Sequence, residues 1–168
     1  MKVLVTGAAG FIGYHVTKRL LEKNITVVGI DNLNKYYDSN LKKARLSDLK
    51  KLKKKFTFYK IDLKNYLRLN KIFKKYKFDY AINLAAQAGV RYSINNPDTY
   101  FTSNVVGFFN LLKCSTKYNI KHLIAASSSS VYGESNKIMS EKLNTDNPVQ
   151  FYASTKKSNE VMAHSFSS

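Results

Sequence analysis

A tyrosine and a lysine near the end of this chain stand at a spacing that could support proton transfer. Tyr152 and Lys156 occur in Tyr-Ala-Ser-Thr-Lys, so a helix there would place both side chains on one face. A lysine ammonium beside a phenol stabilises the phenolate, which makes the tyrosine a usable base near neutral pH. In a chain with 12 tyrosines and many lysines this spacing also arises by chance, so the pair needs support from its surroundings.

A run of serines supplies that support. Ser127 to Ser130 directly follow an apolar stretch and precede Val-Tyr-Gly. If the stretch is a strand of a parallel sheet, it delivers hydroxyls at the carboxyl edge, where ligands of such sheets bind. A serine hydroxyl bonded to a reacting alcohol oxygen would orient it and share its developing charge. We choose Ser128 as the catalytic and substrate-contacting serine, with Ser129 as a second substrate contact; Ser129 and Ser130 are alternatives for the catalytic role.

The N-terminal segment has the spacing of a dinucleotide-binding turn. Residues 6–13 read Thr-Gly-Ala-Ala-Gly-Phe-Ile-Gly, directly after an apolar run. The first glycine permits a tight turn, the second lets backbone amides approach a pyrophosphate, and the third lets the following helix pack on the strand. The helix N-terminus then faces the anion with its N–H groups. The cofactor contacts predicted here are Gly7, Gly10, Phe11, Ile12 and Gly13.

Two carboxylates follow later strands. Asp31 lies where an acidic residue should accept the adenosine ribose hydroxyls, and it would repel a 2′-phosphate, while Asn32 offers no compensating cation. NAD is therefore favoured over NADP, although Asp31 could also simply cap the following loop. Asp62 could meet the adenine edge, or it could start the next helix as an N-cap.

Apolar, β-branched runs alternate along the chain with amphipathic stretches. The expected strands are Lys2–Thr6, Thr26–Ile30, Phe56–Ile61, Tyr80–Leu84 and His122–Ala126. The expected helices are Phe11–Lys23, Leu41–Lys53, Asn65–Lys75, Asp98–Tyr118 and one from near Pro148 onward. Right-handed crossovers turn this alternation into an α/β fold, a Rossmann-like doubly wound parallel sheet of order 3-2-1-4-5 with helices on both faces. Gly133 to Asn147 is expected to be the longest loop.

Length and composition fit one domain over residues 1–168, with 44% hydrophobic residues. Cys114 is the only cysteine and no Cys/His cluster has metal-ligand spacing, so we expect neither a disulfide nor a metal site. The apolar runs are too short for a signal peptide core or a membrane span. We expect a soluble, cytoplasmic protein without a membrane partner.

The formal net charge of +17 raises the question of polyanion binding. The basic residues concentrate between Lys42 and Lys77, with Arg45 and Arg68 among the lysines, whereas the motif-bearing segments are nearly neutral. We therefore place this charge beside the chemistry, on solvated helix faces, and expect no specific nucleic-acid partner. Binding of a polyanion is the alternative.

Taken together, these motifs resemble a known family. The glycine turn, Asp-Asn-Leu-Asn at 31–34 with Tyr-Tyr-Asp at 36–38, Leu-Ala-Ala-Gln-Ala-Gly-Val-Arg-Tyr-Ser at 84–93, the serine run and Tyr152 to Lys157 look like the extended short-chain dehydrogenases/reductases. Within that class they are similar to the UDP-glucuronate 4-epimerases, chiefly through the 84–93 segment. The resemblance covers essentially the whole chain.

The resemblance implies a role for each matching residue. It implies that Asp31 and Asn32 hold the adenosine ribose, that Asp62 and Leu63 lie near adenine, and that Lys156 also contacts a ribose. The implied lining of the cofactor cleft is Ala85, Ala86 and Gln87, with Asn104 near cofactor and sugar. Arg91 is implied to pair with a phosphate or carboxylate of the substrate, and its alternative is a surface arginine on a loop.

The implied reaction interconverts UDP-glucuronate and UDP-galacturonate. Tyr152 takes the proton of the sugar 4-hydroxyl while hydride passes to NAD, the keto-sugar turns, and hydride returns to its other face. Family members are roughly twice as long, so we expect the C-terminal substrate-binding part to be absent here. Other extended-class enzymes, such as a nucleotide-sugar dehydratase or decarboxylase, and an inert NAD-binding fragment are the alternatives. The resemblance also implies a homodimer, formed through the long helices expected to begin near Asp98 and Pro148.

Overall fold

The computed structural model describes residues 1–52, 55–134 and 138–168. Its centre is a parallel sheet formed by β1 (Lys2–Thr6), β2 (Thr26–Asp31), β3 (Phe56–Lys60), β4 (Tyr80–Asn83) and β5 (His122–Ala125). The strands lie in the order β3-β2-β1-β4-β5, which confirms the predicted order and the doubly wound fold. Each predicted strand is present, with its end shifted by at most one residue.

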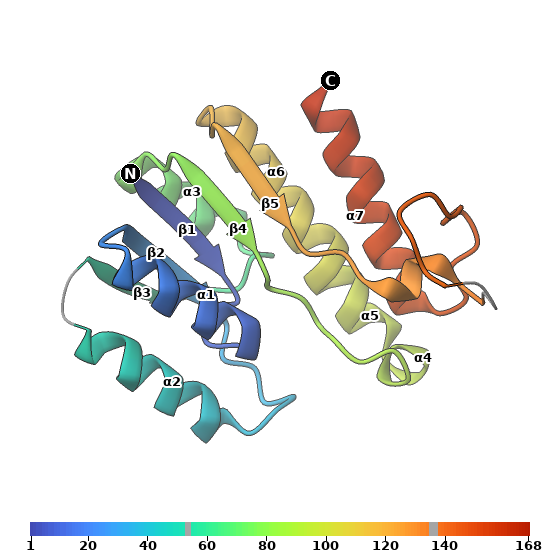
Figure 1. Ribbon diagram of the computed structural model, residues 1–168, viewed down its shortest axis with the longest axis horizontal. Helices are drawn as coiled ribbons and strands as arrows, with labels where there is room; N and C mark the ends of the chain where they lie inside the picture. Colours follow the sequence, from blue (N-terminus) through green and yellow to red (C-terminus); the bar gives the residue numbers. More distant parts are fainter. Residues whose placement is uncertain (53–54, 135–137) are drawn as a thin grey trace.

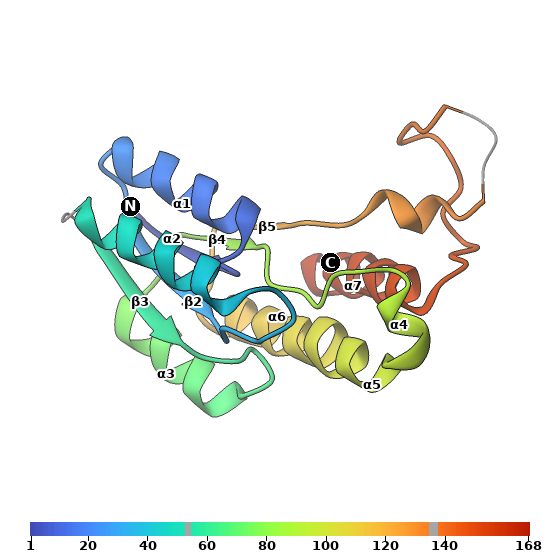
Figure 2. The ribbon, with the colours of Figure 1, turned by 90° about the horizontal axis from the view of Figure 1, so that it is seen from below.

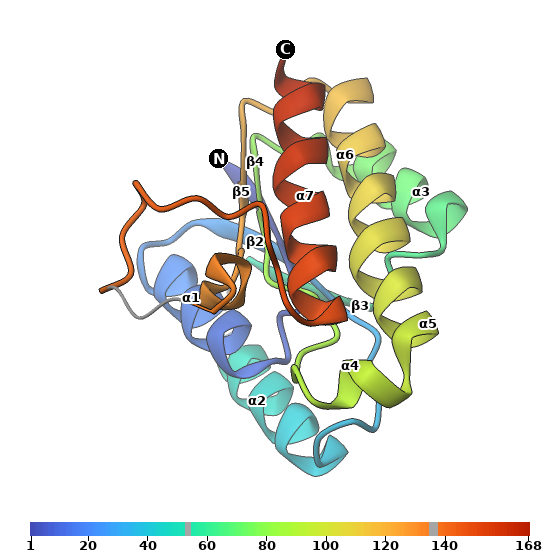
Figure 3. The ribbon, with the colours of Figure 1, turned by 90° about the vertical axis from the view of Figure 1, so that its right-hand side faces the viewer.

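Helices cover both faces of this sheet (Figure 1). They are α1 (Phe11–Glu22), α2 (Ser39–Lys51), α3 (Tyr66–Tyr76), α4 (Tyr92–Asn95), α5 (Pro97–Tyr100), α6 (Gly107–Lys117) and α7 (Phe151–Ser167). Figure 2 shows α1 and α2 on one face, and α3, α6 and α7 on the other. Figure 3 shows α7 running alongside α6, with the N-terminal end of α7 close to α4 and α5.

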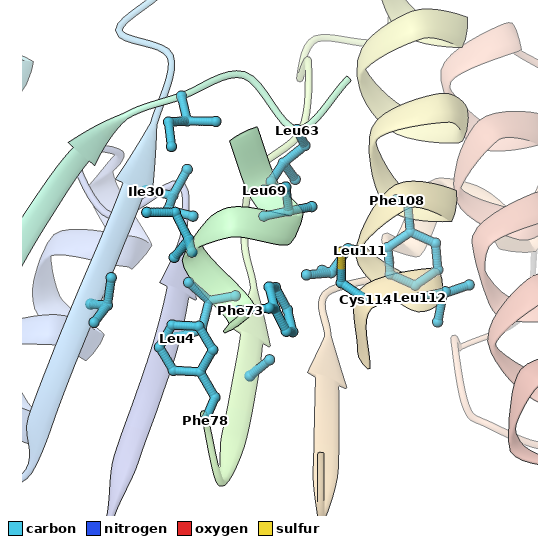
Figure 4. Close-up of a cluster of buried hydrophobic side chains, with 14 residues drawn as sticks. Leu4, Ile30, Leu63, Leu69, Phe73, Phe78, Phe108, Leu111, Leu112 and Cys114 are labelled. Carbon is cyan, nitrogen blue, oxygen red and sulfur yellow. The ribbon is translucent and has the colours of Figure 1, made fainter. Parts of the chain in front are cut away.

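Side chains alternate between the two faces along each strand and thereby build two cores. Val3 and Val5 of β1 pack against α1 and α2, where Leu46 and Leu49 complete one cluster. Leu4 of β1 points the other way, into the larger cluster beneath α3 and α6. Figure 4 shows the aromatic and aliphatic members of this second cluster, among them Ile30, Leu63, Leu69, Phe73, Phe78, Phe108, Leu111 and Leu112.

The predicted single helix from Asp98 to Tyr118 is wrong in its middle. A π-helical turn, η1 (Phe101–Val106), separates α5 from α6. Such turns widen a helix by one residue and are frequent at functional sites. Hydrophobic periodicity does not reveal this insertion, because the flanking helical turns keep the same buried face.

Other departures concern element ends. The helix expected from Leu41 begins two residues earlier, because Asp38 accepts a hydrogen bond from the Asn40 N–H at 2.8 Å and caps it. Its expected last residue, Lys53, lies outside the described residues, as do residues 135–137 of the expected loop. The last helix begins at Phe151, after the extended Gln150, rather than near Pro148. The 3₁₀ turn η2 (Ser129–Tyr132) and the short helix α4 were not predicted.

The strand β5 is at the edge of the sheet, and its outer face is open. Ile124 of β5 is 52% exposed, and Val161 of α7 is also exposed. An apolar surface is therefore exposed beside the last strand. Phe101, Val161 and Phe166 are exposed on the helices through which a homodimer is expected; the dimer itself stays a prediction.

The contact of α1 with the end of β1 has no room for a side chain. A Cβ on Gly13 would lie 2.0 Å from the Gly7 carbonyl oxygen, whereas a Cβ on Gly10 would lie 3.1 Å from the same atom. We expect Gly13→Ala to lower the free energy of unfolding by about 3 kcal/mol, because backbone rather than a flexible side chain must move. Gly10→Ala is the matched control, with an expected loss below about 1 kcal/mol. Urea unfolding measures both, and equal losses would contradict the packing argument.

Candidate active site

A cavity of about 590 Å³ opens at the carboxyl edge of the sheet. Its wall is formed by the segments that follow β1, β2, β3, β4 and β5, together with the first turns of α2 and α7. From the sequence-predicted set, the residues on this wall are Gly7, Gly10, Phe11, Ile12, Gly13, Asp31, Asn32, Asp62, Leu63, Ala85, Ala86, Gln87, Tyr152 and Lys156. The fold therefore brings the predicted dinucleotide turn and the predicted base to one cavity.

The glycine turn and the start of α1 form one part of the cavity wall. Gly10 is the N-cap of α1 and has an extended conformation, and Phe11, Ile12 and Gly13 line the wall. Asp31 stands beside the turn, 7% exposed. Its two carboxylate oxygens accept hydrogen bonds from the N–H groups of Ala9 at 3.2 Å and Leu33 at 2.8 Å. Asp31 thus caps the following loop and lines the cavity, so the two interpretations of this residue are compatible.

Asp62 does not cap the next helix. Asn65 is the N-cap of α3, and its side chain accepts a hydrogen bond from the Arg68 N–H at 3.1 Å. Asp62 instead accepts from the Asn32 side-chain amide at 3.1 Å and from the Lys64 N–H at 3.0 Å, on the cavity wall. The N-cap alternative for Asp62 is therefore wrong.

Tyr152 and Lys156 lie on the first two turns of α7 and both line the cavity. The Tyr152 N–H donates to the Ser93 hydroxyl at 3.2 Å, which fixes the start of the helix. The Lys156 ammonium donates to the Ala126 carbonyl at 2.9 Å, at the end of β5. Burial lowers the pKa of Lys156 to about 8, so the amine still carries its charge near neutral pH.

The four serines of residues 127–130 have different surroundings: the first lines the cavity, and the second caps a short helical turn. Ser127 lines the cavity, and its hydroxyl donates to the Glu160 carboxylate of α7. Ser128, the choice from the sequence, is the N-cap of η2, where its oxygen accepts from the Ser130 N–H at 3.2 Å. Ser128, Ser129 and Ser130 are not among the residues that line the cavity. The sequence could not separate them, because four identical side chains follow the strand and only the packing of this segment decides which residue lines the cavity.

Asn104 stands behind the cavity wall rather than on it. It lies in the π-helical turn η1, 1% exposed. Its side-chain oxygen accepts from the Gln87 N–H at 2.7 Å, and its amide donates to the Gln87 carbonyl and to the Thr155 hydroxyl, both at 3.1 Å. Asn104 therefore joins the segment after β4 to α7, and it can act on the cavity through Gln87 and Thr155.

Two basic side chains lie on the cavity wall. The prediction that the basic segment between Lys42 and Lys77 lies outside the site is therefore wrong for these two residues. Lys42 and Arg45 of α2 both line the cavity. The Lys42 ammonium donates to the Asn34 side chain at 2.7 Å, and Arg45 donates to the Ala9 carbonyl at 3.3 Å. Their spacing along α2 turns them toward the sheet while the neighbouring lysines face solvent. Other wall residues missed from the sequence are Asn34, Tyr36, Tyr37, Leu41, Ser103 and Ser127.

Arg91 is exposed and lies immediately before α4, outside the set of cavity-lining residues. Among residues 1–52, 55–134 and 138–168, no cluster of His, Cys, Asp or Glu side chains could hold a metal ion. Within the same ranges, no helix is long and apolar enough to span a membrane.

Comparison with known proteins finds relatives of this arrangement. Residues 4–168 match the family described as GDP-mannose 4,6 dehydratase. The chain is 52% identical over 168 residues to the protein CapI of Staphylococcus aureus, covering 99% of this chain and 50% of CapI. It is 44% identical over 163 residues to a UDP-glucuronate 4-epimerase of Thermodesulfobacterium geofontis, covering 97% of this chain and 50% of that protein. The chain thus spans about half the length of these relatives.

A solved structure has the same arrangement of elements. UDP-glucuronic acid 4-epimerase from Bacillus cereus, in complex with UDP-glucuronic acid and NAD, superposes with a TM-score of 0.88 at 37% identity. The match covers 99% of this chain and 52% of that protein. It therefore extends over every element that forms the cavity.

The buried amine of Lys156 gives stability a defined dependence on pH. Below pH 8 the amine is charged in both states, so its burial disfavours the folded state fully; between pH 8 and 10.5 the folded state loses the proton first, and stability rises with pH. Across this window we expect the free energy of unfolding of the parent to rise by up to about 3 kcal/mol relative to that of Lys156→Met. Urea unfolding of both proteins from pH 7 to 10.5 measures the difference. A constant difference would show that the amine titrates normally in the folded state.

Proposed function

We propose that this chain, which belongs to the GDP-mannose 4,6 dehydratase family, acts in a UDP-sugar 4-epimerase whose substrate is UDP-glucuronate. In this proposal the chain supplies the residues that bind NAD and the residues that carry out acid–base catalysis. The observation that carries the proposal is that Tyr152 and Lys156 share one cavity with the glycine turn and Asp31. Two relatives support the proposal. The solved structure from Bacillus cereus contains NAD, and both that protein and the Thermodesulfobacterium geofontis relative are UDP-glucuronate 4-epimerases.

The residues on the cavity wall fit a dinucleotide. Backbone N–H groups at the start of α1 suit a pyrophosphate, because the helix end carries partial positive charge. Asp31 suits the hydroxyls of the adenosine ribose, and Asp62 with Leu63 suits the adenine beyond it. The 590 Å³ cavity continues from there to Tyr152 and Lys156, where the nicotinamide end would lie.

Bound NAD would take up hydride from C4 of the sugar and return it to the opposite face. The chain's own residues manage the proton and the geometry. Tyr152 as phenolate takes the proton of the 4-hydroxyl, and the Lys156 ammonium stabilises that phenolate. A serine at the end of β5 orients the reacting oxygen; Ser127 is on the cavity wall, and Ser128, the sequence choice, is its neighbour. Arg91 is proposed to meet the anionic part of the substrate.

The rival functions differ at identifiable points. A 4,6-dehydratase would ordinarily carry an acidic pair after the active-site serine or threonine, whereas Ser129-Ser130-Val131 stand here. This favours epimerisation over dehydration. An inert NAD-binding module would bind the cofactor as well but would not reduce it when sugar is added. Reduction of the bound cofactor by added sugar therefore separates an enzyme from the inert module.

Cofactor choice tests the adenosine end of the cavity. We expect NAD to raise the melting temperature of the chain and NADP to raise it far less, because the carboxylate of Asp31 repels a 2′-phosphate. Asp31→Asn should weaken NAD binding by about tenfold and narrow the preference over NADP, as one charged hydrogen-bond acceptor is lost. Calorimetric titration measures both affinities. Equal affinity of the parent for the two cofactors would contradict the role of Asp31.

Reduction of bound NAD tests the reaction itself. In the presence of NAD we expect UDP-glucuronate, mixed in a stopped-flow instrument, to produce a transient absorbance of reduced nicotinamide, because the hydride is afterwards returned to the sugar; UDP-glucose should produce less. Tyr152→Phe should lower the rate by at least about a hundredfold, because the base is lost. Ser127→Ala and Ser128→Ala, compared side by side, identify the assisting hydroxyl. NAD binding without reduction by either sugar would favour the inert module.

A further inference from the structure

Two loops meet above the glycine turn. One follows β2 and comprises residues 32–38; the other follows β4 and comprises residues 84–91. In the sheet β1 lies between β2 and β4, so a contact between these loops must cross the end of β1. The glycine turn follows β1, and both loops and the turn line the same cavity. The contact between the loops would therefore cross a dinucleotide that is bound along the turn. We call this contact, formed by Asn34 and Tyr36 with Gln87 and Gly89, the bridge.

Asn34 makes the polar half of the bridge. Its side-chain amide donates to the Gln87 side-chain oxygen at 3.2 Å. The buried Lys42 ammonium holds Asn34 from the other side, donating to its side-chain oxygen at 2.7 Å and to its carbonyl at 3.1 Å. Gln87 is itself fixed by the two hydrogen bonds to Asn104. Both ends of the Asn34–Gln87 contact are therefore anchored in the fold.

Tyr36 makes the packed half. Its ring lies 5.0 Å from that of Tyr92. A Cβ on Gly89 would lie 2.1 Å from the Tyr36 hydroxyl, and Gly89 has φ +97, which side chains rarely adopt. The Tyr100 hydroxyl donates to the Ala88 carbonyl at 2.7 Å and holds this turn from beneath. The bare backbone of Gly89 is thus the surface on which Tyr36 rests.

The bridge is a thin wall with space on both sides. Asn34, Tyr36 and Gln87 line the main cavity, and the same three residues line a second hollow of about 470 Å³ behind it. Breaking one hydrogen bond and lifting one ring would open the wall without moving the sheet or its helices.

We propose that the bridge is a clamp that retains the reduced dinucleotide between the two hydride transfers. The inference rests on the proposed function, in which the cofactor must still be present in reduced form when the keto-sugar has turned. Loss of reduced cofactor at that stage would leave a keto-sugar that nothing reduces. Asn34 and Tyr36 hold the bridge through contacts with the protein itself, so their effect falls on the rate of cofactor release.

The test is the rate at which NADH leaves the 168-residue chain. Stopped-flow fluorescence follows NADH displaced by excess NAD. We expect Tyr36→Ala and Asn34→Ala to speed release by about tenfold, with a smaller change in the association rate. Asp38→Ala is the matched control, since Asp38 belongs to the same loop and caps α2 through the Asn40 N–H at 2.8 Å, but neither lines the cavity nor takes part in the bridge; its release rate should stay within about twofold of the parent.

Gly89→Ala tests the bridge from its other side. The added methyl group would collide with the Tyr36 hydroxyl, so release should be fast; adding Tyr36→Phe removes the hydroxyl and should restore part of the slow release. A parent that binds no NADH would overturn the proposed function together with the clamp. A parent that binds NADH, with unchanged release in Tyr36→Ala and Asn34→Ala, would overturn the clamp alone. Equally fast release from Asp38→Ala would also overturn it, because a general loosening of the loop would then explain the effect.

Discussion

The close approach of α1 to the end of β1 is the constraint on which the site depends. Gly13 lies against the Gly7 carbonyl, so the helix begins directly at the carboxyl edge of the sheet. The Thr6 hydroxyl donates to Asn83 at 2.6 Å and accepts from the Ala85 N–H at 3.2 Å, which ties the same edge to the segment after β4. The floor of the cavity is therefore set by backbone packing, and the side chains that give it chemistry are added around that floor.

The acid–base pair depends on a second set of contacts, which run through the interior. Asn104 joins Gln87 to Thr155, and Thr155 in turn donates to the Tyr152 carbonyl at 2.7 Å. The π-helical turn places Asn104 in this position. Each polar group of this network is buried, so an unpaired member would be costly, and the network fixes α7 in one place relative to β4. Tyr152 and Lys156 consequently face the cavity in a defined geometry.

The strong positive charge of the chain divides into two physical roles. Most lysines of α2 and α3 are exposed and keep their hydration. The ion pair between Lys18 of α1 and Asp48 of α2 lies at the surface and contributes little to stability. Lys42 and Arg45 differ, because they line the cavity and hold Asn34 and Ala9 in place. A count of charge along the chain does not distinguish these roles, whereas the direction in which each side chain leaves α2 does.

Local patterns in the sequence were enough to predict the strands, their order, the glycine turn, Asp31, Tyr152 and Lys156. These follow from local patterns: alternation of apolar residues, glycine spacing, and a four-residue step on one helix. The sequence did not reveal that Ser127 rather than Ser128 lines the cavity, that Asn104 lies behind its wall, or that Asn34 contacts Gln87; these are seen only in the folded chain. The physical reason is that each of these depends on a single inserted turn or on contacts between residues far apart in the chain. Such contacts are set by how whole elements pack, and leave no periodic trace in the sequence.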